Sequence, residues 1–444
     1  MTMSRPALRS RPIPRGAATL VVVMVLFFIV ALVAAYTSRN LIFEQRTSAN
    51  QYRSTQAFEA AEAGLEWTLT MLNSGRIDAA CVPRTDPDTA DESFRQRYLN
   101  IATDTGQISA RLRAGGALPR QAACVFDGTG WQCSCPTDDA PTLAAPVGPG
   151  PFPAFVLRFH DRTPDGAPYP AGVVRVESTG CTRLDAAEVC SATTSSGDGR
   201  ATVNIVAALK SALTNPPGAA LTVRGDLAGA NTLQAVNTDV AAGGITLRVG
   251  GTITGEPQAL LGPAGTPSDT SDLAHNVTVV SPDTGLAALS PDRLLSSLFA
   301  AERGTYRLQP AAVQIRCAVD CAASTVRDMA RLNPGRVLWV DGDLDINIPD
   351  TIGSTDFPVV LVVNGSLSVS NAAAKVNGLV YIVGDTLTNI GNLALAGALV
   401  AEGNLTLGGG GVGVTAVTYD RARLDLLHRT NGSFVRIPGS WRDF

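Results

Sequence analysis

An acidic cluster has the residue types that could bind a divalent cation. Asp341, Asp343 and Asp345 alternate in the sequence VDGDLDIN, so in a strand their carboxylates would point to one side. Oxygen ligands of this kind suit calcium, but the spacing does not match the EF-hand loop, because Ile346 stands at its sixth position and Ile352 at its twelfth. The cluster is therefore a weak calcium candidate, a solvated polar face is the favoured interpretation, and no other metal site is expected.

The other signatures of catalysis are missing from the sequence. There is no GxxxxGK[ST] phosphate loop, no HExxH zinc motif and no GxSxG nucleophile elbow. Lys210 and Lys375 are the only lysines. None of the three histidines has another histidine or a cysteine at metal-ligand spacing. We predict that the protein is not an enzyme, has no catalytic residue and needs no cofactor.

Eight cysteines offer a second kind of chemistry, disulfide formation. They are Cys81, Cys124, Cys133, Cys135, Cys181, Cys190, Cys317 and Cys321. In an exported protein an even number predicts a set of disulfides, whose connectivity the sequence leaves open. The intervals from Cys181 to Cys190 and from Cys317 to Cys321 are short enough for local bridges. A zinc site is the less favoured alternative, because the sequence has no CxxC pair.

Composition narrows the class of protein further. The 444 residues include 35 Lys+Arg and 39 Asp+Glu, a formal net charge of −4, which argues against a nucleic-acid partner. With 43 Gly, 27 Pro and only 5% aromatic residues, the chain favours short strands joined by tight turns.

The N-terminal segment predicts a membrane anchor that continues as a longer helix. Residues 1–16 carry four arginines and no acidic residue, and residues 17–36 are uncharged and apolar. Twenty such residues span about 30 Å as a helix, and the preceding arginines place the N-terminus in the cytoplasm. Residues 37–73 continue without proline, with apolar residues on one helix face. A simple signal anchor holding a periplasmic domain would explain only the first half.

The stretch from Arg15 to Glu66 resembles the N-terminal domain of PilX-type minor pilins of type IV pili. The resemblance is strongest at Glu44-Gln45-Arg46 and at the sequence QAFEAAEA, residues 56–63. It implies cleavage after Gly16 by a prepilin peptidase and methylation of the new N-terminal Ala17. It also implies residence in the inner membrane, then assembly with the major pilin and other minor pilins into an extracellular pilus.

One departure from the major pilins concerns the fifth residue of the mature chain. Major pilins carry a glutamate there, whereas this chain has Val21 and no carboxylate between Ala17 and Tyr36. A rare subunit at the pilus tip or in the initiating complex is therefore expected, with a head that could serve in adhesion to an unknown ligand. The alternatives are a K-like minor pseudopilin of type II secretion and a membrane-tethered β-helical enzyme acting on polysaccharide.

The remaining sequence predicts an α+β fold with two β-rich parts. Residues 74–210 contain strand candidates at 154–161, 172–180 and 200–210, and are expected to form a disulfide-containing, pilin-like head with an antiparallel sheet. Residues 218–444 are expected to form a second domain. Its glycines Gly342, Gly365, Gly384 and Gly403 recur at intervals of 23, 19 and 19 residues. This period favours a β-solenoid over an antiparallel sandwich of hairpins.

Overall fold

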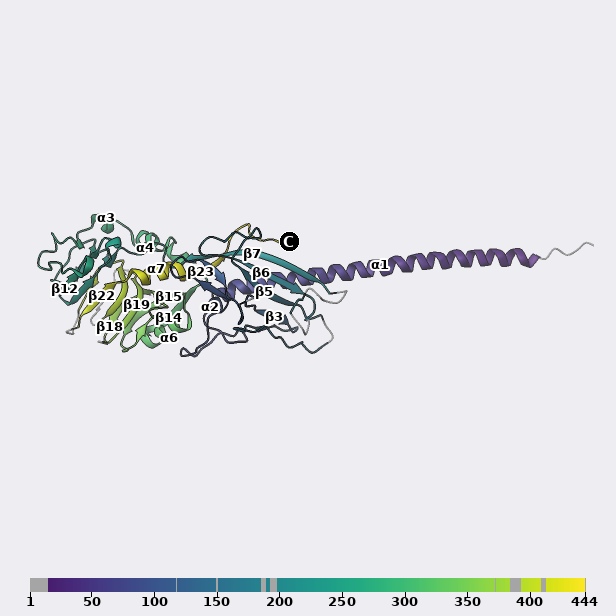
Figure 1. The fold of residues 1–444 in the computed structure, drawn as a ribbon, viewed down its shortest axis with the longest axis horizontal. Helices are drawn as coiled ribbons and strands as arrows, with labels where there is room; N and C mark the ends of the chain where they lie inside the picture. Colours follow the sequence, from purple (N-terminus) through teal and green to yellow (C-terminus); the bar gives the residue numbers. More distant parts are fainter. Residues whose placement is uncertain are drawn as a thin grey trace, which may run out of the picture.

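A long helix leads into an elongated head made of two β-rich parts (Figure 1). The computed structural model describes residues 15–443 except 117, 149–150, 185–188, 192–197, 372, 384–392 and 409–412. Helix α1, Arg15–Leu72, has 58 residues, which corresponds to about 87 Å. The sequence has neither glycine nor proline from residue 17 to residue 63, so nothing interrupts the helix there. It ends where the Asn73 side-chain amide donates to the Leu69 carbonyl oxygen, 2.8 Å away.

The second half of α1 packs across an antiparallel sheet of six strands. The strands, in sheet order, are β23 Gly432–Arg436, β7 Arg200–Ser211, β6 Val173–Cys181, β5 Ala154–His160, β3 Ala123–Phe126 and β4 Trp131–Ser134. The side chains of α1 that face the sheet are small or apolar and buried: Ala57, Ala60, Ala61, Leu65 and Leu72. The predicted amphipathic helix and antiparallel sheet are confirmed, and they pack against each other.

A short segment covers the C-terminal end of α1, which lies within the head. It consists of α2 Phe94–Tyr98, β1 Leu99–Ile101 and β2 Ile108–Ala110. Ser93 and Gln96 form a capping box at the start of α2, which satisfies backbone N–H groups that a helix leaves open. Trp67 of α1 packs edge-on against Phe94, with ring centroids 5.4 Å apart. The helix, this segment and the sheet therefore share one apolar core.

The cysteines form four disulfides, and no described cysteine is free. The bonds join Cys81 to Cys135, Cys124 to Cys133, Cys181 to Cys190 and Cys317 to Cys321. The first attaches the segment around residue 81 to the residue that follows β4, and the second joins β3 to β4, where Cys124 and Cys133 face each other.

The second part is a coil in which every strand pair of the large sheet is parallel, which excludes the antiparallel sandwich. Val360 pairs with Leu379, which pairs with Ala398, so one turn of the coil takes 19 residues here. Apolar residues from successive turns stack into a buried row: Leu338, Leu361, Val380, Leu399, Leu221, Leu247 and Val279.

The order of residues in this row shows that the coil is built from two separate stretches of chain. The inner stretch lies nearer the antiparallel sheet, and the outer stretch lies farther from it. The outer stretch contains β8 Ala219–Val223, β9 Leu227–Ala228, β10 Leu233–Val236, β11 Ile245–Val249, β12 Ala259–Leu261 and β13 Val279–Val280, with 3-10 turns at Ala230–Thr232, Val240–Ala242 and Pro263–Gly265. The inner stretch contains β14 Ala312–Ala322, β15 Val337–Ile346, β16 Thr351–Ile352, β17 Val359–Asn364, β18 Leu367–Val369, β19 Lys375–Ile382, β20 Ala394–Ala401, β21 Leu405–Thr406 and β22 Thr415–Tyr419.

The two stretches meet at β20. Its first half pairs with β22 and its second half with β8, so one turn of the coil is shared between residues far apart in sequence. Strand β14 lies at the end nearest the antiparallel sheet, and β12 lies at the opposite end (Figure 1).

The turns of the coil are tied together by side chains that accept backbone hydrogen bonds from the next turn. Asp343 accepts from the Ser366 N–H at 2.6 Å, and Asn404 accepts from the Asp226 N–H at 2.8 Å. Gly365 sits where a Cβ would lie 2.4 Å from the Gly342 carbonyl oxygen, so the recurring glycine allows adjacent turns to approach. Gly384 of the same repeat lies outside the described residues.

Helices connect and cover the coil. They are α3 Thr284–Ala287, α4 Pro291–Phe299, α5 Arg303–Arg307, α6 Ala323–Leu332 and α7 Arg421–Thr430. The hydroxyl of Ser290 caps α4 by accepting from the Arg293 N–H.

The end of the chain returns to the antiparallel sheet through β23. Gly432 pairs with Ser211 of β7, so the coil is inserted between two neighbouring strands of this sheet. Asn73 fastens the new strand, because its amide donates to the Phe434 carbonyl oxygen at 2.9 Å and accepts from the Phe434 N–H at 2.8 Å.

Candidate functional site

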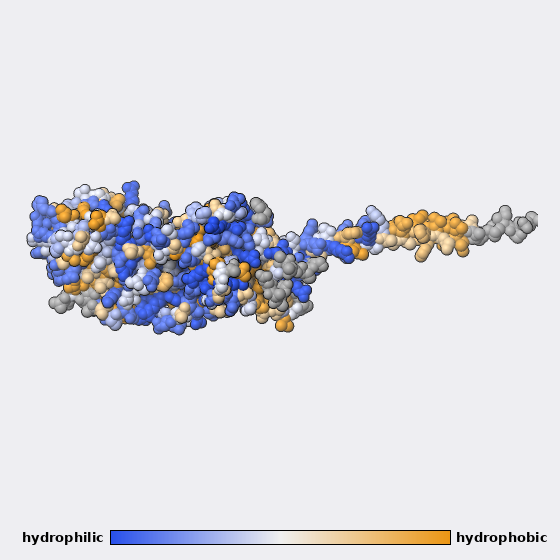
Figure 2. Space-filling model, viewed as in Figure 1, coloured by the Kyte–Doolittle hydropathy of each residue, from blue (hydrophilic) through white to orange (hydrophobic). Residues whose placement is uncertain are grey.

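The outer half of α1 leaves a long apolar surface without any covering element. From residue 18 to residue 55 every side chain of α1 is exposed. Phe27 and Phe28 are 74% and 72% exposed. On the face seen in Figure 2, apolar residues form a continuous stretch in the outer part of the helix, and polar residues are mixed with them nearer the head. Such a surface is costly in water and requires a membrane or other apolar helices around it.

The length and composition of this segment suit a membrane. Among the described residues, α1 is the one helix long and apolar enough to cross a bilayer, with a mean hydropathy of 3.1 in its most apolar window. The first charged side chain in this exposed segment is Arg39, whose guanidinium lies 5.6 Å from the ring centre of Phe43. Val21, the residue expected at the fifth position of the mature chain, is 58% exposed and belongs to this apolar surface.

The expected processing residues lie at the start of this helix. Gly16 and Ala17 fall in the first turn of α1, which begins at Arg15. The remainder of the leader, residues 1–14, lies outside the described residues.

The aspartates of β15 have partners in neighbouring parts of the coil. Asp341 accepts from the Trp339 indole N–H and from the Asn364 amide, both at 2.9 Å. Partial burial raises the pKa of Asp341. The hydrogen bonds and the charge of Arg307 outweigh this effect and hold the pKa of Asp341 below its ordinary value. Asp345 accepts from the hydroxyls of two serines of the next turn. Within the described part of the chain, no three metal-ligating side chains gather into one group.

A buried charge cluster, which the sequence analysis missed, lies beside the junction of the two stretches of the coil. Glu402 is 1% exposed and accepts two hydrogen bonds from Arg303, at 2.9 and 3.0 Å. The Tyr381 hydroxyl donates to the same carboxylate at 2.5 Å. Burial, with the nearby Glu402 charge, raises the pKa of Tyr381, so this hydroxyl stays protonated. A charge so well matched acts as an anchor between α5 and the coil. No sequence pattern marks this cluster, because Arg303 and Glu402 are 99 residues apart in the chain.

The chain combines a membrane-anchoring helix with a head in which the same helix packs on an antiparallel sheet, an arrangement that defines a pilin-like protein. Residues 15–66 match the protein family described as PilX N-terminal, so the predicted resemblance to PilX-type pilins is confirmed over this segment.

Curated proteins and solved structures provide two further comparisons. No curated protein matches the chain. Among solved structures, the crystal structure of the competence-associated pilin ComZ from Thermus thermophilus matches with 12% identity over 88% of this chain and 97% of that one. The TM-score of 0.18 is too low to indicate a shared overall fold.

Proposed function

We propose that this protein is a minor pilin, which rests in the inner membrane with its N-terminus in the cytoplasm and then enters a type IV pilus. The observation that carries the proposal is the exposed apolar half of α1, which lies within the segment that matches PilX N-terminal. In the membrane, lipid covers this surface, and in the filament the helices of the major pilin and of other minor pilins replace the lipid. The role is structural, and no catalytic step is needed.

Processing by a prepilin peptidase is the first testable consequence. Replacing Gly16 by valine should block cleavage, because a branched side chain beside the scissile bond cannot fit the peptidase. Mass spectrometry of the wild-type protein should find a methylated N-terminus at Ala17, whereas the G16V variant should keep residues 1–16. An intact leader on wild-type protein, in cells that contain the peptidase, would contradict the pilin assignment.

We infer a position at the tip or in the initiating complex from two features. The first is Val21, because an apolar residue cannot form the ion pair that the fifth-position glutamate gives a major pilin. The second is the coil, which extends the head beyond the antiparallel sheet (Figure 1). Subunits stacked around a shaft have neighbours on all sides, whereas a terminal subunit has room for such an extension. An exposed coil at the end of a pilus is also placed to contact a surface, and adhesion is the role that this favours.

Immunogold labelling of sheared pili tests this position. Gold should lie at filament ends in the wild type and also in Val21→Glu, since the coil still prevents stacking. The paired residues Ser211 and Gly432 allow a matched variant in which a short turn replaces residues 213–430. Val21→Glu combined with this replacement removes both obstacles and should place gold along the shaft. Regular labelling of the shaft by the wild-type protein would refute the terminal position.

The two alternatives have less support. K-like pseudopilins have largely helical heads, whereas the head here is built from strands. A β-helical enzyme needs free carboxylates on its coil. Here the carboxylates of Asp341 and Asp345 already accept hydrogen bonds from other residues of the coil.

A further inference from the structure

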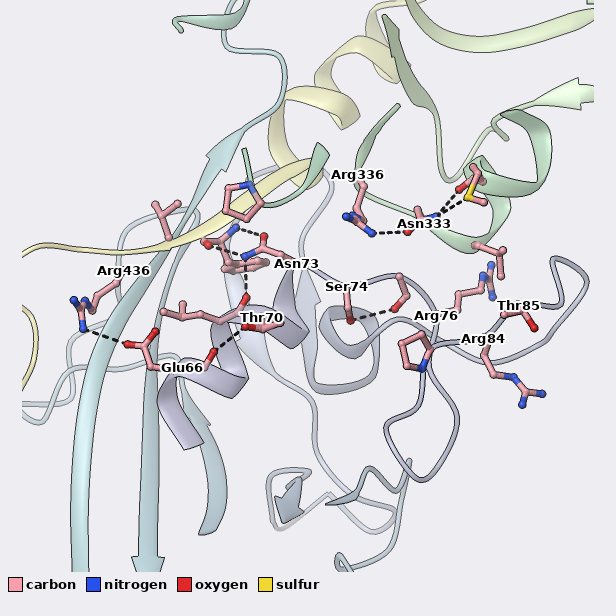
Figure 3. A pocket seen from close by; sticks show the side chains of 18 residues that line it. Glu66, Thr70, Asn73, Ser74, Arg76, Arg84, Thr85, Asn333, Arg336 and Arg436 are labelled. Carbon is pink, nitrogen blue, oxygen red and sulfur yellow. Dashed lines mark hydrogen bonds and ion pairs between the residues drawn. The ribbon is translucent and has the colours of Figure 1, made fainter. Parts of the chain in front are cut away.

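A cleft lies where the end of α1 meets the coil (Figure 3). Its volume is about 780 Å³. The end of α1, the loop around Pro83, strand β23 and helix α6 surround it. Apolar residues from each of these elements line it, namely Leu69, Pro83, Val435, Met329 and Leu332, and Pro310 adds to them from the loop before β14. The cleft exists because the coil is inserted between β7 and β23, so its two sides come from the two parts of the head.

The charge of the cleft is strongly unbalanced. Four arginines line it, Arg76, Arg84, Arg336 and Arg436, against one carboxylate, Glu66. Arg436 pairs with Glu66 at 3.5 Å, and Arg84 pairs with an aspartate outside the lining at 2.9 Å. Arg76 hydrogen-bonds to backbone carbonyl oxygens and interacts electrostatically with Asp91 and Glu92, which lie outside the lining. The cleft thus carries net positive charge close to apolar groups, which favours an anionic occupant.

Arg336 is the centre of this imbalance. Its guanidinium donates to the Asn333 side-chain oxygen at 2.6 Å and to the Ala312 carbonyl oxygen at 3.4 Å, and it forms no ion pair within the described residues. Its Nε atom is buried without a hydrogen-bond acceptor. Burial lowers the pKa of Arg336 to about 10, as expected for a cation that lacks a compensating charge. The buried Arg95 adds to the positive potential, because it too donates only to carbonyl oxygens.

The cleft also contains one open position on a strand edge, at Arg436 of β23. In β23, alternate residues direct their backbone groups away from β7. Along this outer edge, Gly432 donates to the Gly335 carbonyl oxygen and Phe434 is paired with the Asn73 side chain. Arg436 is the next residue on the edge, and its outward backbone N–H and C=O have no partner in the described part of the chain. An extended peptide could pair there.

We propose that this cleft binds an extended acidic peptide segment of a partner protein. The segment continues the outer edge of β23 from Arg436, places apolar side chains on Met329 and Leu332, and directs a carboxylate to Arg336. This assignment concerns the head alone and does not depend on filament entry through α1, so failure of either leaves the other intact.

Peptide binding to the full chain in detergent micelles tests the proposal. The probe is a fluorescein-labelled peptide of alternating valine and glutamate, compared by fluorescence anisotropy with the same peptide carrying glutamine. The glutamate peptide should bind more tightly. Arg336→Gln should raise its Kd at least tenfold, because a charged hydrogen-bond partner is lost. Arg293→Gln is the matched control, since Arg293 is exposed on α4 outside the cleft, and it should leave the Kd unchanged.

A second variant keeps the test decisive if Arg336→Gln fails to fold. Arg436→Pro removes the outward N–H while leaving the bonds from β23 to β7, and its Kd should be at least tenfold higher than that of Arg436→Ala, which loses the same guanidinium but keeps the N–H. Equal binding of the two peptides, or equal binding by all variants, would overturn the proposal. Displacement of the peptide by free glutamate at the same concentration would instead define a small-anion site. Tighter binding of polygalacturonate would define a polysaccharide site, and either result would overturn the peptide assignment.

Discussion

Replacing Gly180 by alanine should detach the inner half of α1 from the antiparallel sheet. Gly180 lies in β6 directly under the helix, and a Cβ there would lie 2.1 Å from the Ala57 carbonyl oxygen and 2.5 Å from the Ala61 nitrogen. Both are backbone atoms of a regular helix, so no rotamer change can relieve the overlap. The helix must move away as a whole, and the buried contacts of its small residues would be lost.

The expected cost is about 3 kcal/mol or more, at the upper end of the range for overpacked cores. Tryptophan fluorescence provides the measurement, because the ring centroids of Trp67 in α1 and Trp131 in β4 lie 5.8 and 4.8 Å from that of Phe155 in β5. Denaturant titration of the protein in micelles should show an earlier transition for Gly180→Ala. Gly130→Ala is the control, since a Cβ at Gly130 meets no atom within 4 Å. Equal midpoints for the two variants would show that the helix is not packed as described.

Replacing Glu402 by alanine should destabilise the coil by about 3–5 kcal/mol, the range for removing one partner of a buried ion pair. The change leaves the Arg303 guanidinium without its buried acceptor and the Tyr381 hydroxyl without a partner for its proton. Arg303 begins α5, the helix that precedes the inner stretch of the coil. We therefore expect α4 and α5 to loosen first, and limited proteolysis at these helices should be faster than in the wild type.

Asp292→Asn is the matched control for this prediction. Asp292 contacts the same arginine at 2.8 Å, but its side chain is 75% exposed. An exposed ion pair contributes less than about 1 kcal/mol because water screens it. Thermal unfolding should therefore separate the two variants clearly. Similar melting temperatures for Glu402→Ala and Asp292→Asn would mean that burial does not set the strength of this cluster.

The local features of the molecule could be predicted from sequence because each depends on near neighbours. The run of residues 17–36 and the spacing of Ala61, Leu65 and Leu72 fix a helix that is apolar all round and then on one face. Alternation of apolar and polar residues predicted β5, β6 and β7. The interval of 19 residues between glycines predicted the turns of the coil, since it reflects one circuit of the backbone.

Contacts between distant segments came only from the tertiary structure. Strand β8 pairs with β20, about 180 residues later, and the last strand β23 joins β7 of the first sheet. Parallel pairing has no turn between its strands, so no local signal marks which strands meet. The bond from Asn73 to Phe434, the buried pair of Arg303 and Glu402, and the cleft around Arg336 all follow from these pairings. The sequence by itself determined the membrane helix and the repeating strand. Long-range packing decided where the coil is inserted. It therefore also decided that the charge of Arg336 lies in a cleft without an ion-pair partner among the described residues.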